Sequence, residues 1–238
     1  MPDDGTTRRA VLAGGAVVLG GGIVYGATRS SDRRAPATPS FHATDATTGY
    51  GVALAGAPVA GSLDAPIDLY YWSDYQCPFC RQFERETLPE LLDREVGSGD
   101  VRLAFLSFPY LGPGSRVAAI AAKCVWRNAA DDGRAFWAWH TRMFERQREN
   151  ATPGAMRSHA LDIARGVAGL DADAVASCMD EEDAIAEDIA SEVAKARSLG
   201  FEGSPSFAAY HREADVSGRL VGAQPYERFE EAFRRLRE

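Results

Sequence analysis

The fold follows from Cys77-Pro78-Phe79-Cys80, a pair of cysteines separated by two residues (CxxC). The six residues before the pair read Ile-Asp-Leu-Tyr-Tyr-Trp and predict a strand, while the eight residues after it predict a helix. Pro78 suits the first helical position because it has no N–H to leave unpaired. Cys77 therefore falls at the helix N-cap, where free N–H groups and the positive dipole end stabilise a thiolate. Cys80, one turn further on, is placed to attack a mixed disulfide formed at Cys77.

A CxxC pair is a redox centre or one half of a metal site, and the number of available ligands separates the two. A structural zinc site takes four ligands, most often from two such pairs. This chain has one CxxC, and no histidine lies near it in the sequence. The sequence favours a redox centre, and we expect no metal and no cofactor beyond the cysteines themselves.

The flanking sequence predicts an α/β chain. Residues 101–106 predict a second strand, parallel to the strand before the CxxC, which completes a βαβ unit. Residues 115–200 contain amphipathic helices and no convincing strand. Strand signals return in residues 203–222, and residues 225–237 predict a closing helix. The order βαβ, helices, ββα predicts a thioredoxin fold with a helical domain inserted between its two halves. The residues expected to cap three of the inserted helices are Ser115, Thr152 and Asp171.

The N-terminal sequence indicates export. Arg8-Arg9 precedes an apolar, glycine-rich and alanine-rich run over residues 10–27, and this pattern resembles a Tat-type signal. The run is just long enough to span a bilayer, so residues 1–27 are a signal or an uncleaved membrane anchor. Residues 28–50 are rich in Ser, Thr, Pro and Ala, which is typical of a flexible linker. The thioredoxin-like domain is then expected at 51–114 and 201–238, with the helical insertion at 115–200.

The charge of the chain excludes one class of partner. The formal net charge of the 238 residues is −8, and residues 1–34 contribute five Arg and three Asp, or +2. The remaining chain therefore carries −10, which argues against nucleic acid as a partner.

Four motifs in the expected order carry a family resemblance. They are Asp64-Ala65-Pro66, the stretch Ser-Asp-Tyr-Gln-Cys-Pro-Phe-Cys at 73–80, Gly-Ser-Pro-Ser-Phe at 203–207, and Gly-Ala-Gln-Pro-Tyr at 222–226. From about Gly56 to the C-terminus the sequence resembles the DsbA-like thioredoxin family. The resemblance implies thiol–disulfide oxidoreductase activity outside the cytoplasm. It also implies exported substrate proteins with free cysteines and a re-oxidising or reducing redox partner in the membrane.

The resemblance assigns roles to the motif residues. Cys77 is the expected nucleophile, exposed at the helix start, and Cys80 is the more covered resolving thiol. Ser204-Pro205 resembles the cis-proline loop that packs against the CxxC in this fold and presents its backbone to an extended substrate peptide. Pro78 and Phe79, the two residues between the cysteines, are expected to tune the reactivity of the thiols.

Two features depart from the family pattern. Phe79 stands where a strongly oxidising member often carries His, so we expect a less extreme oxidant. Tyr71 stands six residues before Cys77, where many thioredoxin-fold proteins carry a buried acid. Asp74 and Glu84 are the acids nearest in sequence, and both are expected to be solvated surface charges.

The remaining cysteines and one histidine have structural interpretations. Cys124 and Cys178 fall on apolar stripes of helices in the insertion. They form either a structural disulfide, which we favour, or two buried free thiols, since Cys packs like a small hydrophobe. His140 lies among aromatic residues and is expected at the edge of the core.

Several functions remain open from the sequence. We favour a DsbA-like enzyme that donates the Cys77–Cys80 disulfide to exported proteins. The alternatives are a reductase or isomerase that uses the same cysteines, a membrane-anchored metallo-protein assembly factor that binds metal through the CxxC, and a non-catalytic binding domain with a structural disulfide.

Overall fold

The computed structural model describes residues 38–129, 133–181 and 183–238. The expected signal or anchor at 1–27 and the first part of the expected linker lie outside the described residues. Within the described part of the chain, no helix is long and apolar enough to cross a membrane.

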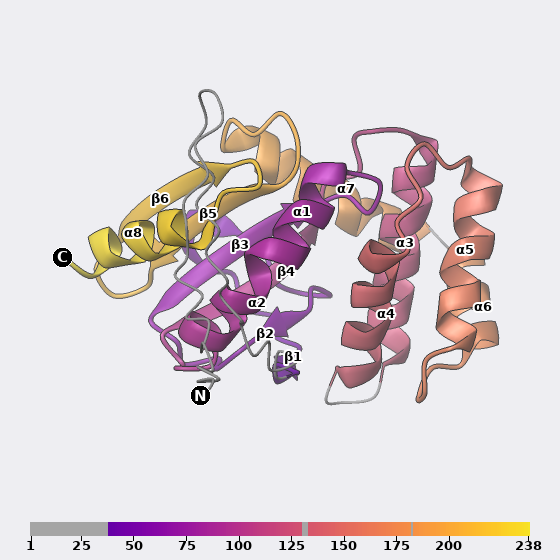
Figure 1. The fold of residues 1–238 in the computed structure, drawn as a ribbon, viewed down its shortest axis with the longest axis horizontal. Helices are drawn as coiled ribbons and strands as arrows, with labels where there is room; N and C mark the ends of the chain where they lie inside the picture. Colours follow the sequence, from indigo (N-terminus) through magenta and orange to yellow (C-terminus); the bar gives the residue numbers. More distant parts are fainter. Residues whose placement is uncertain (1–37, 130–132, 182) are drawn as a thin grey trace, which may run out of the picture. The chain divides into compact units, whose positions relative to one another are not determined.

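The centre of the structure is a mixed six-stranded sheet with strand order β1-β2-β4-β3-β5-β6 (Figure 1). Strands β3 and β4 pair in parallel, from Ile67 opposite Val101 to Ser73 opposite Ser107. The other neighbouring pairs are antiparallel. The strands are β1 (Phe41–His42), β2 (Val59–Ala60), β3 (Ile67–Ser73), β4 (Val101–Ser107), β5 (Ser206–His211) and β6 (Val216–Val221).

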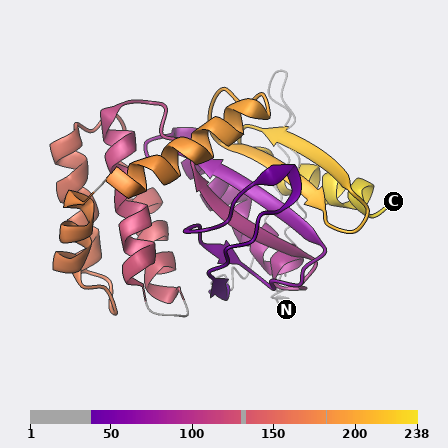
Figure 2. The same ribbon diagram turned by 180° about the vertical axis from the view of Figure 1, so that it is seen from behind.

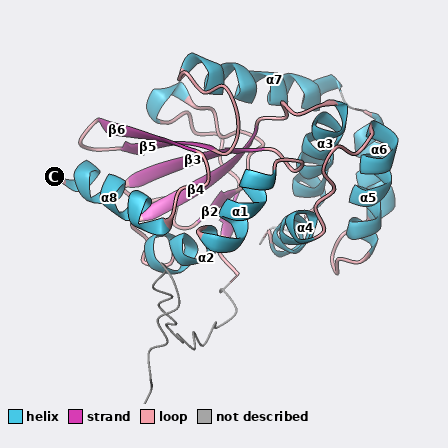
Figure 3. Ribbon diagram, turned by 45° about the horizontal axis from the view of Figure 1, so that its top comes forward, coloured by secondary structure: helices cyan, strands magenta, loops and turns pink. Residues whose placement is uncertain are grey.

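Helices cover both faces of the sheet and form a block at one end. Figure 3 shows α1, α2 and α8 on one face, α7 on the other, and α3 to α6 beside the sheet. The view from behind shows α7 lying across the strands (Figure 2). The helices are α1 (Pro78–Glu86), α2 (Leu88–Leu91), the π-helical turn η2 (Leu92–Val96), α3 (Pro113–Asn128), α4 (Arg134–Glu145), α5 (Pro153–Arg165), α6 (Ala172–Asp180), α7 (Asp183–Ser198) and α8 (Tyr226–Arg237), with a 3-10 turn η1 at Gly49–Gly51.

This order of elements confirms the predicted fold class. The unit β3-α1-α2-β4 is the βαβ half, β5-β6-α8 is the ββα half, and α3 to α7 lie between them in the sequence. The expected caps Thr152 and Asp171 each accept a hydrogen bond from a backbone N–H of the first helical turn. The expected cap Ser115 is wrong, because α3 begins two residues earlier at Pro113 and has Gly112 as its N-cap.

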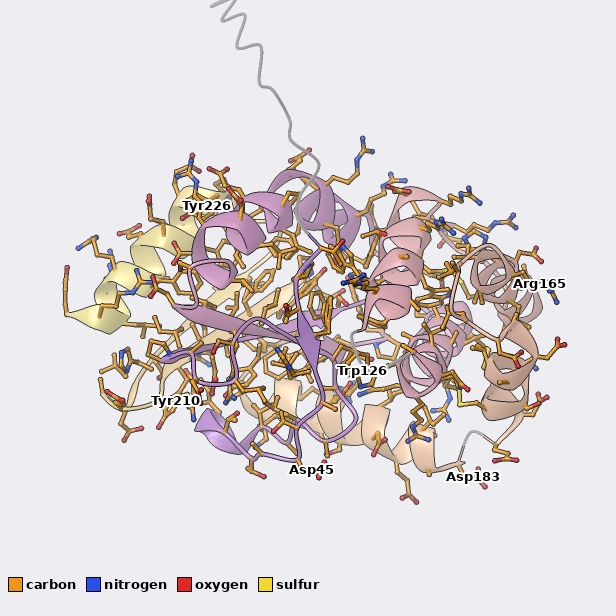
Figure 4. All side chains as sticks on the ribbon, turned by 90° about the horizontal axis from the view of Figure 1, so that it is seen from below. Asp45, Trp126, Arg165, Asp183, Tyr210 and Tyr226 are labelled. Atoms are coloured by element: carbon orange, nitrogen blue, oxygen red, sulfur yellow. A yellow bond between two sulfur atoms is a disulfide. The ribbon has the colours of Figure 1, made fainter. Side chains whose placement is uncertain are left out.

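The alternation of side chains along β3 builds two cores, one on each face of the sheet. Tyr71 packs with the aromatic residues under α1 and α8, while Tyr70 and Trp72 pack under α7. Side chains also fill the space between the sheet and the helical block, where Trp126 of α3 contacts Phe41 of β1 (Figure 4). Both faces of the strand before the CxxC are therefore fixed by packing, which places the motif rigidly at the end of β3.

Candidate functional site

The CxxC occupies the predicted place at the start of α1. Cys77 is the N-cap residue with extended backbone, and Pro78 is the first helical residue. The carbonyl of Cys77 accepts the first helical hydrogen bond from Arg81 N at 3.1 Å. Cys80 therefore lies within the first turn, and both cysteines are free thiols in this structure.

Cys77 is more covered than the family resemblance implies. The exposed fraction is 1% for Cys77 and 0% for Cys80, whereas Phe79 between them is 60% exposed. The cover is the loop at Ser204-Pro205, whose peptide bond is cis. The Cys77 sulfur, when protonated, donates to the Ser204 carbonyl oxygen, and the Cys80 sulfur lies within hydrogen-bond distance of the Ser204 hydroxyl, each at 3.3 Å. The loop thus contacts both sulfur atoms, and it belongs to the residues that lead into β5.

The pKa values of the two thiols are displaced in opposite directions. A hydrogen bond from the Cys80 thiol is the largest influence that lowers the pKa of Cys77 to about 6, although burial opposes it. The backbone N–H groups of Cys80 and Phe79 and the Ser204 hydroxyl lower it further. Burial raises the pKa of Cys80 well above its usual value, and the nearby Cys77 sulfur raises it further. At neutral pH the pair therefore consists of a thiolate at Cys77 and a thiol at Cys80.

Asp74 is buried, and the expectation of a surface charge was wrong. Its side chain accepts hydrogen bonds from three backbone N–H groups, those of Gln76 at 2.9 Å, Tyr110 at 3.1 Å and Leu111 at 3.2 Å. Burial nevertheless raises the pKa of Asp74, because its effect exceeds that of these donors. Asp74 thereby holds the loop after β4 against the CxxC.

Glu84 is also buried, which again contradicts the expectation of a surface charge. Its side chain is 4% exposed and its Oε1 lies 3.0 Å from Nε2 of His140 on α4. The other ring nitrogen of His140 lies 2.7 Å from the Tyr75 hydroxyl. His140 itself is 1% exposed and is deeper in the core than expected. A sequence pattern on α1 could not reveal this partner, because His140 is 56 residues away.

Tyr71 occupies the position of the buried acid that the family pattern leads one to expect. The residue is fully buried, and its ring stacks on Phe207 and packs against Phe83. Within the described part of the chain its hydroxyl has no hydrogen-bond partner. Burial raises the pKa of Tyr71 well above its usual value, and the charges of Glu84 and Cys80 raise it further.

Two further residues at the site did not emerge from the sequence. Tyr110 is half-exposed, and burial together with the charge and a hydrogen bond of Cys77 raises its pKa to about 12. Gln147, after α4, donates to the carbonyls of Cys77 at 2.9 Å and Tyr75 at 3.0 Å. Tyr110 could have been found, because the carboxyl ends of parallel strands lie at one sheet edge, where loops form sites. Gln147 carried no comparable signal.

The second cysteine pair lies away from this site. Cys124 of α3 and Cys178 of α6 form a disulfide across 54 residues of sequence. It links two helices of the block that lies between the two halves of the thioredoxin fold. In the residues that the structure describes, His, Cys, Asp and Glu side chains nowhere form a group of three or more able to hold a metal ion.

A CxxC at a helix N-terminus beneath a cis-proline loop, on a sheet of this topology, defines a thioredoxin-fold protein with a redox-type site. A family model described as Thioredoxin matches residues 54–232, which is 179 of the 238 residues. The chain therefore belongs to this thioredoxin family.

Named relatives refine the likeness. Disulfide bond formation protein D of Bacillus subtilis is 32% identical over 133 residues, which cover 54% of this chain and 57% of that protein. A probable disulfide bond formation protein D of Bacillus cereus is 25% identical over 147 residues, 61% of this chain and 66% of that protein. The chain thus spans less than two thirds of the length of these curated relatives.

Solved structures support the same fold. The crystal structure of oxidised BdbD from Bacillus subtilis superposes with a TM-score of 0.67 at 23% identity and covers 82% of this chain and 100% of that one. A thioredoxin-like oxidoreductase from Silicibacter pomeroyi has a TM-score of 0.60 at 29% identity, with 76% of this chain and 92% of that chain covered.

Proposed function

We propose that this chain is a thiol–disulfide oxidoreductase of the DsbA-like type, with Cys77 as nucleophile and Cys80 as resolving thiol. One observation carries the proposal: two thiols one helical turn apart have oppositely displaced pKa values beneath the Ser204-Pro205 loop. A low pKa supplies the thiolate that exchanges with disulfides and leaves readily from them. The named relatives, which are disulfide bond formation proteins, favour this activity over a metallo-protein assembly factor.

The proposed reaction donates a disulfide to an exported protein. A substrate thiolate attacks the Cys77 sulfur of the oxidised pair, the bond between the two enzyme sulfurs breaks, and Cys80 leaves with the electron pair. A second substrate thiolate then attacks the substrate sulfur of the mixed disulfide, and Cys77 leaves as a thiolate. The substrate gains a disulfide and the enzyme becomes a dithiol. A redox partner, which we place in the membrane, must then accept two electrons from the dithiol.

The loop and the motif residues have supporting roles in this proposal. Ser204 and Pro205 present their backbone to an extended substrate segment beside Cys77. Pro78 begins the helix whose N–H groups face the thiolate, and the exposed Phe79 contacts the substrate next to the reacting sulfur. The half-exposed Tyr110 continues this apolar rim.

We also propose an extracytoplasmic location and a division of the chain into parts. The twin arginine and the apolar run at 10–27 support export by a Tat-type signal, which is either cleaved or retained as an anchor. In this proposal residues 51–114 and 201–238 form the thioredoxin-like domain and residues 115–200 form the helical insertion. The linker expected at 28–50 does not extend over its whole range, because β1 (Phe41–His42) pairs with β2 and Phe41 is buried in the core.

The redox potential of the Cys77–Cys80 pair, together with turnover of a reduced and unfolded substrate protein, tests the function. The wild-type chain should form substrate disulfides, and Cys77→Ser should abolish the reaction. Cys80→Ala should trap substrates as mixed disulfides, while replacing Cys124 and Cys178 together by Ala serves as the control that keeps exchange. A potential near −270 mV, about that of thioredoxin, would contradict the donor direction and favour the reductase alternative. Absence of any exchange at Cys77 would refute the oxidoreductase itself.

A further inference from the structure

We propose that the helical insertion positions the nucleophile, because Gln147 of the insertion and Gln76 beside the CxxC form a reciprocal clasp. The clasp fixes the backbone that presents the Cys77 sulfur. It joins the CxxC turn, which is residues 74–77 between β3 and α1, to the loop at 147–151 between α4 and α5. The inference rests on the proposed function and adds positioning residues to it. Both glutamines act through the backbone and take no part in the exchange of sulfur atoms.

The CxxC turn is only partly held by its own hydrogen bonds. The Cys77 N–H donates to the Asp74 carbonyl at 3.0 Å, and the Gln76 N–H donates to the Asp74 side chain at 2.9 Å. These bonds close the turn without using the carbonyls of Tyr75 and Cys77. Pro78 follows and has no N–H with which to fix its own peptide group. The orientation of these peptide groups therefore depends on contacts from elsewhere in the chain.

Gln147 supplies those contacts from the insertion. Its amide nitrogen carries two N–H groups, which donate to the Cys77 carbonyl at 2.9 Å and the Tyr75 carbonyl at 3.0 Å. Because both partners are acceptors, they determine which way the amide is turned. The Cys77 carbonyl also accepts from the Arg81 N–H at 3.1 Å, so both of its lone pairs are used. The peptide group between Cys77 and Pro78 is thus held from the insertion and from α1 together.

Gln76 makes the reciprocal contacts from the turn to the insertion. Its amide nitrogen donates to the carbonyls of Arg148 at 3.2 Å and Ala151 at 3.4 Å. Its amide oxygen accepts from the Ser115 hydroxyl of α3 at 3.1 Å. The Gln76 side chain is buried, and all three of these contacts reach the insertion. The turn and the insertion therefore hold each other in both directions.

The packing around the clasp leaves no room for the two parts to slide. A Cβ atom at Gly114 of α3 would collide with the Ala151 carbonyl oxygen and would lie 2.8 Å from the Gln76 amide oxygen. Only a glycine fits between α3 and these groups. In an interior packed this closely, a displacement of one group shifts its neighbours. A change at either glutamine should therefore move the backbone of the CxxC turn.

The position of this backbone matters because the groups that stabilise the Cys77 thiolate come from elsewhere. They are the Cys80 thiol, the backbone N–H groups of Cys80 and Phe79, and the Ser204 hydroxyl. Hydrogen bonds to the sulfur weaken steeply when their geometry is poor. A small shift of the Cys77 backbone should therefore weaken several of these contacts at once, although neither glutamine is one of the groups that make them.

The amide oxygen of Gln147 offers a way to separate positioning from stability. This oxygen is buried, and no described residue donates a hydrogen bond to it. A buried acceptor without a partner costs stability, which offsets part of what the two donated bonds contribute. Gln147→Met keeps the length of the side chain and removes both donors and the unpaired acceptor. This variant should change the unfolding temperature little while releasing the CxxC turn.

The test compares Gln147→Met and Gln76→Met with the wild-type chain in the reduced state. Thiolate absorbance at 240 nm is followed against pH, with Cys77→Ser as the baseline. We expect the pKa of Cys77 to rise by about one unit in each variant, the effect of weakening one hydrogen bond to a charged group. If the two glutamines form one clasp, the double variant should show about the same rise as either single variant rather than the sum.

Alkylation by iodoacetamide provides a second reading, because only the thiolate reacts. The rate at Cys77 should fall about twofold at pH 7 in Gln147→Met, and the difference should vanish at pH 9, where the thiol is ionised in both proteins. General damage to the site predicts a difference at both pH values. Gln82→Met is the matched control, since this exposed glutamine of α1 bonds only Glu86 at 2.9 Å among the described contacts, and its pKa and rates should equal those of wild type.

A Cys77 pKa within about 0.2 units of wild type in both Gln147→Met and Gln76→Met would overturn the clasp. A lowered unfolding temperature with this unchanged pKa would assign the glutamines a purely structural role and would overturn it equally. An equal pKa rise in Gln82→Met would also count against it. These outcomes leave the proposed function intact. Failure of wild-type Cys77 to exchange with disulfides would instead refute the proposed function, and this failure is measured independently of the variants.

Discussion

The low pKa of Cys77 depends on Cys80, and removing that thiol is the most direct perturbation of the site. The Cys80 thiol is the largest single influence that lowers the pKa of Cys77 to about 6. Cys80→Ala deletes the donor but keeps the helix, because Ala is the best helix former. The backbone N–H groups at the start of α1 and the Ser204 hydroxyl remain in place.

The expected size of the change follows from the strength of the lost contact. A hydrogen bond to a charged group contributes about 1.5 kcal/mol at the lower end of its range, and one pKa unit corresponds to about 1.4 kcal/mol. The lower end applies because a thiol is a weak donor. The pKa of Cys77 should therefore rise by about one unit in Cys80→Ala. At pH 7 the thiolate fraction should fall from about nine tenths to about one half.

Thiolate absorbance at 240 nm, followed against pH, measures this pKa directly. Cys77→Ser supplies the baseline from tyrosine, and alkylation rates at pH 7 provide a second reading that should fall about twofold. An unchanged or lower pKa in Cys80→Ala would show that the helix N-terminus and the Ser204 loop are sufficient, and the assignment of the Cys80 thiol as the leading influence would be wrong.

Three further outcomes follow from the structure. The double replacement Cys124→Ala and Cys178→Ala should lower the unfolding free energy by about 4 kcal/mol in urea titrations, since the disulfide closes 54 residues, and the pKa of Cys77 should not change. Lys123→Met should cost about 3–5 kcal/mol in the same assay, because it leaves Glu192 charged and buried without its ion-pair partner, and a loss below 1 kcal/mol would contradict this. The folded pKa of Cys77 lies below the ordinary 9.0, so the unfolded dithiol binds more protons between these values. The unfolding free energy of the reduced chain should therefore rise from pH 6 to pH 9 by about 4 kcal/mol relative to Cys77→Ser, and this gain should be absent below pH 6.

The sequence predicted those features that a short stretch of chain determines by itself. Pro78 after Cys77 specifies a helix start, and Thr152 and Asp171 have side chains that satisfy the N–H groups of their own first turns. The fold class also followed, because the order of strands and helices restricts the topology to a few choices. Ser115 is not the cap, because Pro113 also favours the start of a helix. The preferences of residue types for helix starts do not show which of these two positions begins the helix.

The site was harder to predict because its energetics depend on distant partners. Asp74 and Glu84 look like surface acids in sequence, since acids are seldom buried unless they are paired. Two of the three backbone donors to Asp74 lie 36 and 37 residues away, and the partner of Glu84 is a histidine 56 residues away. The cover over Cys77 comes from Ser204, 127 residues further on. Only the folded chain supplies these contacts, and they determine which of the two thiols ionises.

The contacts around Cys77 lower its pKa without a side-chain donor between the two cysteines. With Phe79 in place of the histidine that strongly oxidising members often carry, the pKa of Cys77 is still lowered to about 6, by the Cys80 thiol, the helix N–H groups and Ser204. Corresponding values are about 3.5 for DsbA and about 7 for thioredoxin. When the pH of the solution exceeds the pKa of the nucleophilic thiol, ionisation stabilises the dithiol. Each unit of this difference contributes about 1.4 kcal/mol, which is about 30 mV for a two-electron couple. The lowered pKa of Cys77 therefore stabilises the dithiol, which supports the proposed direction of disulfide donation.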